Sequence, residues 1–116
     1  MRFTDDIGGA TDPNHNQTGV GVVKKAPATF VLAGVSSATD AAVYLNGKLF
    51  YDKGAALAPR AFGTNFYIGE QGSSPFEYWN GAIEEILVYN TALTPAQITQ
   101  DTKYLKAKYG IGTTVP

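Results

Sequence analysis

The stretch AAVYLNGKLFY, residues 41–51, carries the clearest local signal in the chain. Asn46 and Gly47 tolerate the positive φ angles of a type I′ turn, and apolar segments flank them on both sides. The demands of the turn explain both residues without any binding role. The stretch therefore predicts a β-hairpin.

Residues that oppose one another across a two-residue turn lie on the same face of a hairpin. We expect one face to carry Val43, Leu45, Lys48 and Phe50, and the other to carry Ala42, Tyr44, Leu49 and Tyr51. Neither face is polar. One face is expected to meet the core. The other, which carries Tyr44 and Tyr51, is expected to be a binding face or a surface that other protein covers.

Short runs rich in β-branched and aromatic residues lie on both sides of this hairpin and predict further strands. They are VGVVKK (20–25), ATFVLAGVSS (28–37), TNFYIGE (64–70) and WNGAIEEILVYN (79–90). Residues 1–19 are rich in Gly, Asn, Asp and Thr, and they indicate loop around at most one short strand near Phe3.

The period of the pattern changes near the C-terminus and predicts a helix over residues 95–109. Thr94 can cap it, Pro95 suits its first position and Gln97 completes a capping box. One stripe at helical spacing carries Ile98, Thr102, Leu105 and Tyr109. Gly110 is expected to end the helix. Five or six strands followed by one amphipathic helix predict a single β-sandwich domain over residues 1–116, with the helix at one end or edge.

Composition excludes several classes of function. The chain has 116 residues, 44% of them apolar and 16% charged, and a formal net charge of −1, so nucleic acid and anionic membranes are not expected partners. No apolar run approaches the ~20 residues that span a bilayer, and no signal peptide follows Met1. Cysteine is absent and His15 is the only histidine, which excludes thiol catalysis, thiolate metal sites and a two-histidine metal site within one chain.

Several motifs, taken in order, resemble the C-terminal part of concanavalin A-like jelly-roll domains of the laminin-G and pentraxin kind. They are FVLAGVSSATDAAVYLNGKLF (30–50), FYIGE (66–70), WNGAIEEILVYNTALTPAQI (79–98) and the closing YLKAKYGI (104–111), which is similar to bacterial and phage versions. The resemblance covers residues 28–111, and it implies an all-β, antiparallel β-sandwich with one C-terminal helix. Glu84 stands where the family has Asp.

The strands that precede this part in the family are missing, so the predicted sandwich is partial. A partial sandwich leaves strand edges and an apolar face uncovered, which soluble proteins rarely tolerate. Either another chain completes the sheets, or the chain is a fragment or trimmed variant of a longer domain. We favour partnership with other protein.

Glu84 and Glu85 are the first candidates for chemistry. Neighbouring residues of a strand point to opposite faces, so this pair is not expected to converge on one glycosidic bond as the carboxylates of a glycosidase do. Glycosidases of this fold carry an E-x-D-x-E run, which is absent here. We expect one Glu to accept hydrogen bonds from loop backbone or to pair with a basic side chain, and we expect no catalytic residues.

Aromatic residues before the same strand are candidates for binding. Tyr78 and Trp79, with the neighbouring Asn80, can contact a sugar ring or another protein, with Tyr78 the more exposed member. Trp79 can equally plug the core at the start of the strand. We also name Tyr44 and Tyr51 on the hairpin as candidates for an interface.

No cofactor is expected. Calcium is a weak alternative, because oxygen ligands cluster near the N-terminus and many relatives bind calcium. The candidates are Asp5, Asp6, Asp12 and Glu84. Their spacing matches no EF-hand loop, and acidic residues in turns usually only form the turn.

The sequence thus predicts a non-enzymatic recognition or assembly module, outside the cell or on a virion, that packs against other chains as a homo-oligomer or larger assembly. A phage capsid, tail or fibre accessory protein is one such component. The alternative is a carbohydrate-binding, lectin-like module, and a glycoside hydrolase is the remote third. Fold alone does not choose among them.

Overall fold

The computed structural model describes residues 3–4, 17–18, 28–56, 67–69 and 78–112. In chain order its elements are β1 (Phe3–Thr4), β2 (Gln17–Thr18), β3 (Leu32–Ser36), β4 (Ala41–Leu45), β5 (Lys48–Asp52) and α1 (Pro95–Tyr109). The predicted strand at 20–25 lies outside the described residues, as do Asp5, Asp6 and Asp12.

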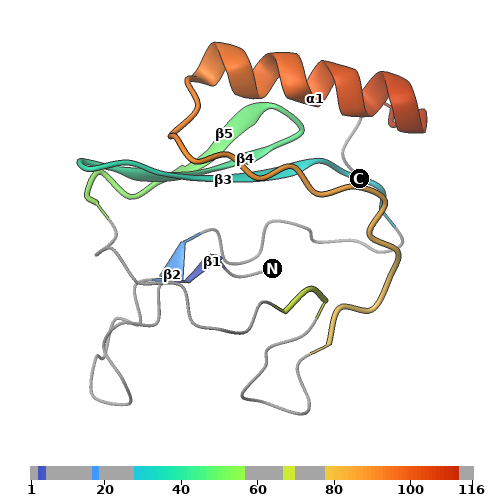
Figure 1. Cartoon of the computed structure of the whole chain (residues 1–116), viewed down its shortest axis with the longest axis horizontal. Coiled ribbons are helices and arrows are strands. Elements are labelled where there is room, and N and C mark those ends of the chain that lie inside the picture. Colours follow the sequence, from blue (N-terminus) through green and yellow to red (C-terminus); the bar gives the residue numbers. More distant parts are fainter. Residues whose placement is uncertain (1–2, 5–16, 19–27, 57–66, 70–77, 113–116) are drawn as a thin grey trace.

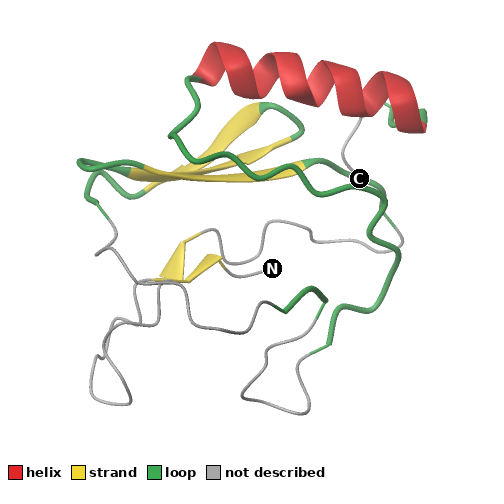
Figure 2. Ribbon diagram, viewed as in Figure 1, coloured by secondary structure: helices red, strands yellow, loops and turns green. Residues whose placement is uncertain are grey.

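The strands form a two-stranded sheet, β1-β2, and a three-stranded antiparallel sheet, β3-β4-β5. In Figure 1 the larger sheet lies between α1 on one side and the β1-β2 pair on the other. Figure 2 shows the same arrangement by element type, with the helix running over the sheet. Within the described residues, the sandwich is thus represented by the three-stranded sheet, the short β1-β2 pair and the helix.

The predicted hairpin and its turn are confirmed. Asn46 and Gly47 have φ angles of 52° and 82°, both in the left-handed region that a type I′ turn needs. Asn46 also ties the turn to the segment before β3. Its backbone N–H donates to Val31 O at 2.8 Å, and its Oδ1 accepts from Val31 N–H at 2.8 Å.

The predicted faces of the hairpin are wrong beyond its first residues. Leu45 pairs with Lys48 and Tyr44 with Leu49, but Val43 then pairs with Tyr51, not with Phe50. A β-bulge between Val43 and Tyr44 causes the shift, because one extra residue of β5 is accommodated there. An alternating pattern cannot be carried through a bulge.

The core lies around β4, the central strand. Val43 and Leu45 are buried there, and Phe30 and Leu32 pack against them. Ala41 and Ala42 are also buried, so β4 is covered on both of its faces. All five residues of the edge strand β5 are exposed.

The helix begins and ends where the sequence predicts. The Thr94 side chain accepts from the N–H of Gln97, the side chain of Gln97 accepts from the N–H of Thr94, and Pro95 opens the first turn. Gly110 ends the helix with φ 64°. Ile98 and Thr102 are buried, and a Cβ added at Gly47 would lie 3.2 Å from Thr102. The helix therefore rests directly on the hairpin turn.

The predicted strand at 79–90 is not formed. Tyr78 makes an isolated bridge, and residues 79–93 have no strand assignment. Beside the bridge, Trp79 N–H donates to Gly69 O at 2.6 Å. In Figure 1 this segment climbs from the lower layer, passes along the sheet and leads into α1. A strand needs a neighbour to share its backbone hydrogen bonds, and an apolar run alone does not supply one.

Candidate functional site

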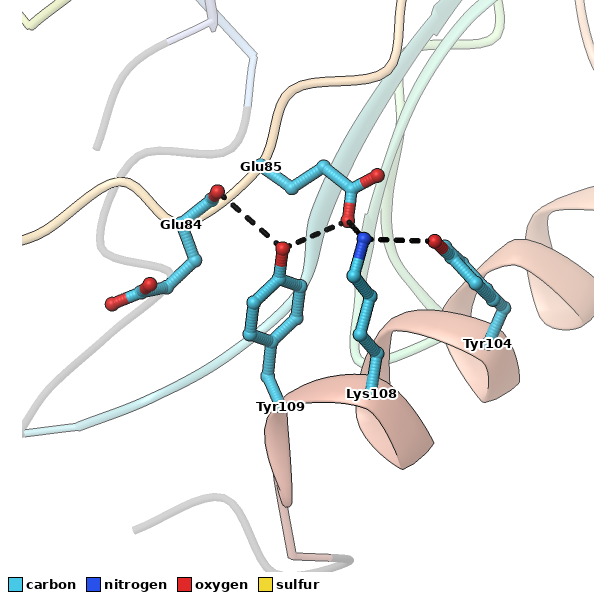
Figure 3. Close-up of polar contacts among 5 residues, drawn as sticks. All are labelled: Glu84, Glu85, Tyr104, Lys108 and Tyr109. Carbon is cyan, nitrogen blue, oxygen red and sulfur yellow. Dashed lines mark hydrogen bonds and ion pairs between the residues drawn. The ribbon is translucent and has the colours of Figure 1, made fainter.

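The carboxylate of Glu85 is the centre of a polar cluster between the segment 83–89 and the helix. Its Oε2 accepts from Lys108 Nζ at 3.1 Å and from the Tyr109 hydroxyl at 3.0 Å. Lys108 Nζ also donates to the Tyr104 hydroxyl at 2.9 Å and lies over the rings of Tyr104 and Tyr109, 5.3 and 5.4 Å from their centroids. Figure 3 shows these contacts converging on one side of the segment.

The neighbouring Glu84 takes no part through its side chain. Figure 3 shows its carboxylate pointing away from that of Glu85, and only its backbone carbonyl accepts from the Tyr109 hydroxyl, at 3.5 Å. Strand alternation does not explain why the two carboxylates diverge, because the segment is not a strand. The expectation that one Glu pairs with a basic side chain is confirmed by the ion pair of Glu85 with Lys108.

The cluster favours the protonated forms of Lys108 and Tyr109. The hydrogen bond to Tyr104, followed by the one to Glu85, raises the pKa of Lys108. Loss of water around the phenol, and then its hydrogen bond to Glu85, raises the pKa of Tyr109. Lys108 is thus held as a cation and Tyr109 as a hydrogen-bond donor, and their contacts with Glu85 join the two segments.

A second tie joins the same two segments. The Tyr89 hydroxyl donates to Asp101 Oδ2 at 2.9 Å, and this hydrogen bond raises the pKa of Tyr89. The segment is thus held to α1 by side chains at Glu85 and at Tyr89, which compensates in part for the missing strand ladder. Sequence reasoning missed Asp101 and Tyr104. Tyr104 could have been predicted from its spacing to Lys108, because residues four apart are neighbours on a helix surface.

An exposed apolar strip is the main surface feature of this segment. We define the 83–89 strip by its members Ile83, Ile86, Leu87, Val88 and Tyr89, all exposed. Val88 has 77% of its surface in water, although it stands in a run whose composition is typical of a buried strand. Contiguous exposed apolar surface is typical of interaction sites.

The aromatic candidates Tyr78 and Trp79 lie just before the strip in the sequence. Tyr78 is 62% exposed and Trp79 38%, so Tyr78 is the more exposed member as predicted. Trp79 meets Phe30 edge to face, with ring centroids 6.1 Å apart, and its indole N–H donates to Ala82 O at 3.4 Å. Trp79 is therefore partly packed and partly accessible, and Asn80 beside it is exposed. Contact of these residues with a ligand stays a prediction.

The hairpin tyrosines are separated by the register shift. Tyr44 is half-buried on the central strand, whereas Tyr51 is exposed on the edge strand and pairs with Val43. The prediction that Tyr44 and Tyr51 share one face of the hairpin is therefore wrong.

Two negative findings apply to the described part of the chain. No group of His, Cys, Asp or Glu side chains there is arranged to hold a metal ion. Within those same ranges, no helix is long and apolar enough to cross a membrane. The calcium candidate Glu84 is thus not part of such a group, and the other candidates are outside these ranges.

Comparison with solved structures gives the fold a second source of support. The chain is similar to the crystal structure of an S-layer domain-containing protein (residues 221–444) from Clostridium thermocellum, with a TM-score of 0.58 and 19% identity. The alignment covers 67% of this chain and 41% of that one, so the chain spans less than half of the structure that it matches. At this identity the likeness shows the fold alone.

Comparison by sequence leads to the family. No curated protein matches the chain. The model of a laminin-G-type family, described as the concanavalin A-like lectin/glucanases superfamily, matches residues 10–99. That match spans the hairpin, the 83–89 strip and the first turn of α1. The chain therefore belongs to the concanavalin A-like lectin/glucanase superfamily.

Proposed function

We propose that the chain is a non-enzymatic recognition and assembly module of an extracellular surface or a virion, which packs its 83–89 strip against other protein chains. One observation carries this proposal. Ile86, Leu87 and Val88 are exposed in succession, and no strand pairs with them in the part of the chain that the structure describes. An exposed apolar run of this kind is typically covered by other protein.

The polar ties behind the strip support the same function. Glu85 and Tyr89 bind the helix side chains Lys108 and Asp101, so the segment is held in place although it has no ladder. A surface that is already positioned loses less conformational entropy when a partner binds. The similar solved structure is that of an S-layer domain-containing protein, which supports a place at a cell surface for this chain.

The mass of the chain in solution tests this proposal. We expect sedimentation equilibrium to give a mass above that of the monomer, and we expect Val88→Lys to lower it by placing a charge in the covered surface. Thr91→Lys is the matched control, since Thr91 is exposed, lies just beyond the strip and receives the same charge. A chain that remains monomeric at all concentrations, or a mass that Val88→Lys leaves unchanged, would contradict the proposal.

Carbohydrate binding is the second candidate, and the exposure of Tyr78 favours it. A tyrosine with 62% of its surface in water next to a partly accessible Trp79 can stack on a sugar ring. If this function is correct, Tyr78→Ala abolishes binding on a glycan array without changing the melting temperature. The control variant Tyr51→Ala, on β5, keeps the binding. No binding by the unmodified chain removes this candidate.

A glycoside hydrolase remains the third alternative. The divergence of the Glu84 and Glu85 side chains in Figure 3 supports a non-enzymatic role, because hydrolysis needs two carboxylates that face one glycosidic bond. Incubation with a panel of β-glucans is expected to release no reducing ends. Release that depends on Glu84 or Glu85 would overturn the non-enzymatic assignment.

A further inference from the structure

The edge strand β5 has an unusual distribution of charge. Its sequence is Lys48-Leu49-Phe50-Tyr51-Asp52, so a cation begins the strand, an anion ends it, and the large apolar residues lie between them. All five residues are exposed, and β5 is the outer strand of the described three-stranded sheet. The strand therefore presents an apolar centre with opposite charges at its two ends.

This order of residues is complementary to itself when a second copy runs antiparallel. With Phe50 on a twofold axis, Lys48 faces Asp52 of the second copy and Leu49 faces Tyr51 of the second copy. The axis repeats each contact, which gives two ion pairs and a continuous apolar centre. Such isologous contacts, in which one patch meets itself, are the commonest arrangement in homodimers.

We propose that β5 is a contact between two copies of this chain, with Lys48 of each copy paired to Asp52 of the other. The inference rests on the proposed assembly function and names a second copy as the partner at this surface. It uses a surface other than the 83–89 strip, so the two can be tested separately.

The local structure fits side-chain docking better than a continuous ladder. The bulge at Val43 and Tyr44 disturbs the backbone spacing of β5, and such bulges protect edges from indiscriminate strand pairing. The charged ends then select the partner and its direction. Asp52 is held at its end because its Oδ1 accepts from the N–H of Gly54 at 2.8 Å. No ion pair engages Lys48 within the described residues.

Charge reversal tests this contact sharply, because the predicted pairs are reciprocal. Lys48→Glu would place two carboxylates opposite each other at both ends of the contact, and Asp52→Lys would place two ammonium groups there. We expect each variant to raise the dissociation constant between copies by about tenfold or more, measured by sedimentation. Lys103→Glu, with the same change of charge on the exposed side of α1, is the control and should leave the constant within about twofold.

A mixture of the Lys48→Glu and Asp52→Lys variants is the decisive part of this experiment. Lys48→Glu and Asp52→Lys chains should associate with each other more tightly than either associates with itself. In the mixed pair one end joins the two introduced side chains, which carry opposite charges, and the other end keeps the original pair of Lys48 with Asp52. The double variant that carries both changes should also recover. Restoration in the mixture excludes misfolding as the cause of the single defects.

The result that would overturn this contact differs from the one that would overturn the assembly function. If Val88→Lys lowers the mass while both charge reversals are silent, β5 is not the contact and the proposed function stands. If the reversals weaken association and their mixture restores it, but Val88→Lys has no effect, β5 is the contact and packing through the 83–89 strip is wrong. Defects without restoration in the mixture also overturn the Lys48–Asp52 pairing.

Discussion

The central strand β4 and the 83–89 strip are both rich in apolar residues, but their surroundings are opposite. Both are short, apolar runs with the composition of sandwich strands, yet Val43 is 1% exposed and Val88 is 77% exposed. The strand β4 has a neighbour on each side, and the strip has none within the described residues. The segments that surround an apolar run therefore determine whether it is buried. Its composition shows only that burial would be favourable.

The largest expected effect comes from placing the same charge at these two valines. Val43→Asp buries an unpaired carboxylate in the core and should cost more than about 3 kcal/mol of the free energy of unfolding. Val88→Asp should change it by no more than about 0.5 kcal/mol. Urea denaturation measures the free energy of unfolding of both variants, at a protein concentration low enough to keep the chain monomeric. Equal costs would show that the two valines have the same surroundings.

The next prediction concerns the turn on which the helix rests. Gly47→Ala forces a side chain into the left-handed region, which costs roughly 1–2 kcal/mol, and brings its Cβ within 3.2 Å of Thr102. Gly54→Ala meets the same backbone cost at φ +65° but has nothing within 4 Å of its added Cβ. The difference between the two free energies of unfolding therefore isolates the contact of the turn with α1. A difference of zero would mean that the turn is not held against α1 at Thr102.

A smaller effect is expected where the strip leads into the helix. Thr94→Ala removes the acceptor for the Gln97 N–H and one half of the capping box, which should cost about 1 kcal/mol. Thr94→Ser keeps the hydroxyl and is the matched control. Loss of helicity on heating, followed by circular dichroism, should move to lower temperature only in the alanine variant. If both variants melt together, the Thr94 cap does not stabilise α1.

The smallest effect is expected from the polar ties, and it depends on pH. The pKa values of Tyr89 and Tyr109 are raised in the folded chain above the usual 10.0, and that of Lys108 above 10.5. Groups whose pKa is higher in the folded state stabilise it fully at pH values below the unfolded pKa, and this stabilisation is lost as pH rises through the folded pKa. The stabilisation from these groups should therefore stay constant from neutral pH to about 9 and should be lost progressively above about 10.

Tyrosine-to-phenylalanine variants identify the groups responsible. The free energy of unfolding of Tyr89→Phe and of Tyr109→Phe should depend less on pH in the alkaline range than that of the unmodified chain. Tyr78→Phe, an exposed tyrosine outside both ties, should keep the full dependence. Alkaline loss of stability that persists unchanged in the Tyr89→Phe/Tyr109→Phe double variant would place its origin in Lys108 or outside these ties.

Local chemistry made part of this fold predictable. The turn at Asn46-Gly47 and the helix from Thr94 to Gly110 follow from backbone preferences and caps that act within a few residues, and both are confirmed. The pairing of one Glu with a basic side chain was also expected, although its partner Lys108 was not identified.

The remaining features depend on contacts between distant segments. The bulge in β5 shifted the faces of the hairpin, and periodicity contains no information on where an extra residue is inserted. The segment 79–90 has the composition of a strand, but a ladder requires a partner strand that the run does not itself specify. For the same reason the exposure of the 83–89 strip could not be predicted from the run itself.

Hydrogen exchange of β4 and of the 83–89 strip, measured together over a range of protein concentrations, tests the central claim most directly. The claim is that β4 is covered within the chain whereas the strip is covered by other chains. We predict that amides of residues 41–45 exchange slowly at every concentration, while those of residues 86–89 exchange rapidly in dilute solution and become protected as copies associate. Rapid exchange of residues 86–89 at concentrations where the copies are associated would contradict the claim, as would protection already present in the dilute monomer.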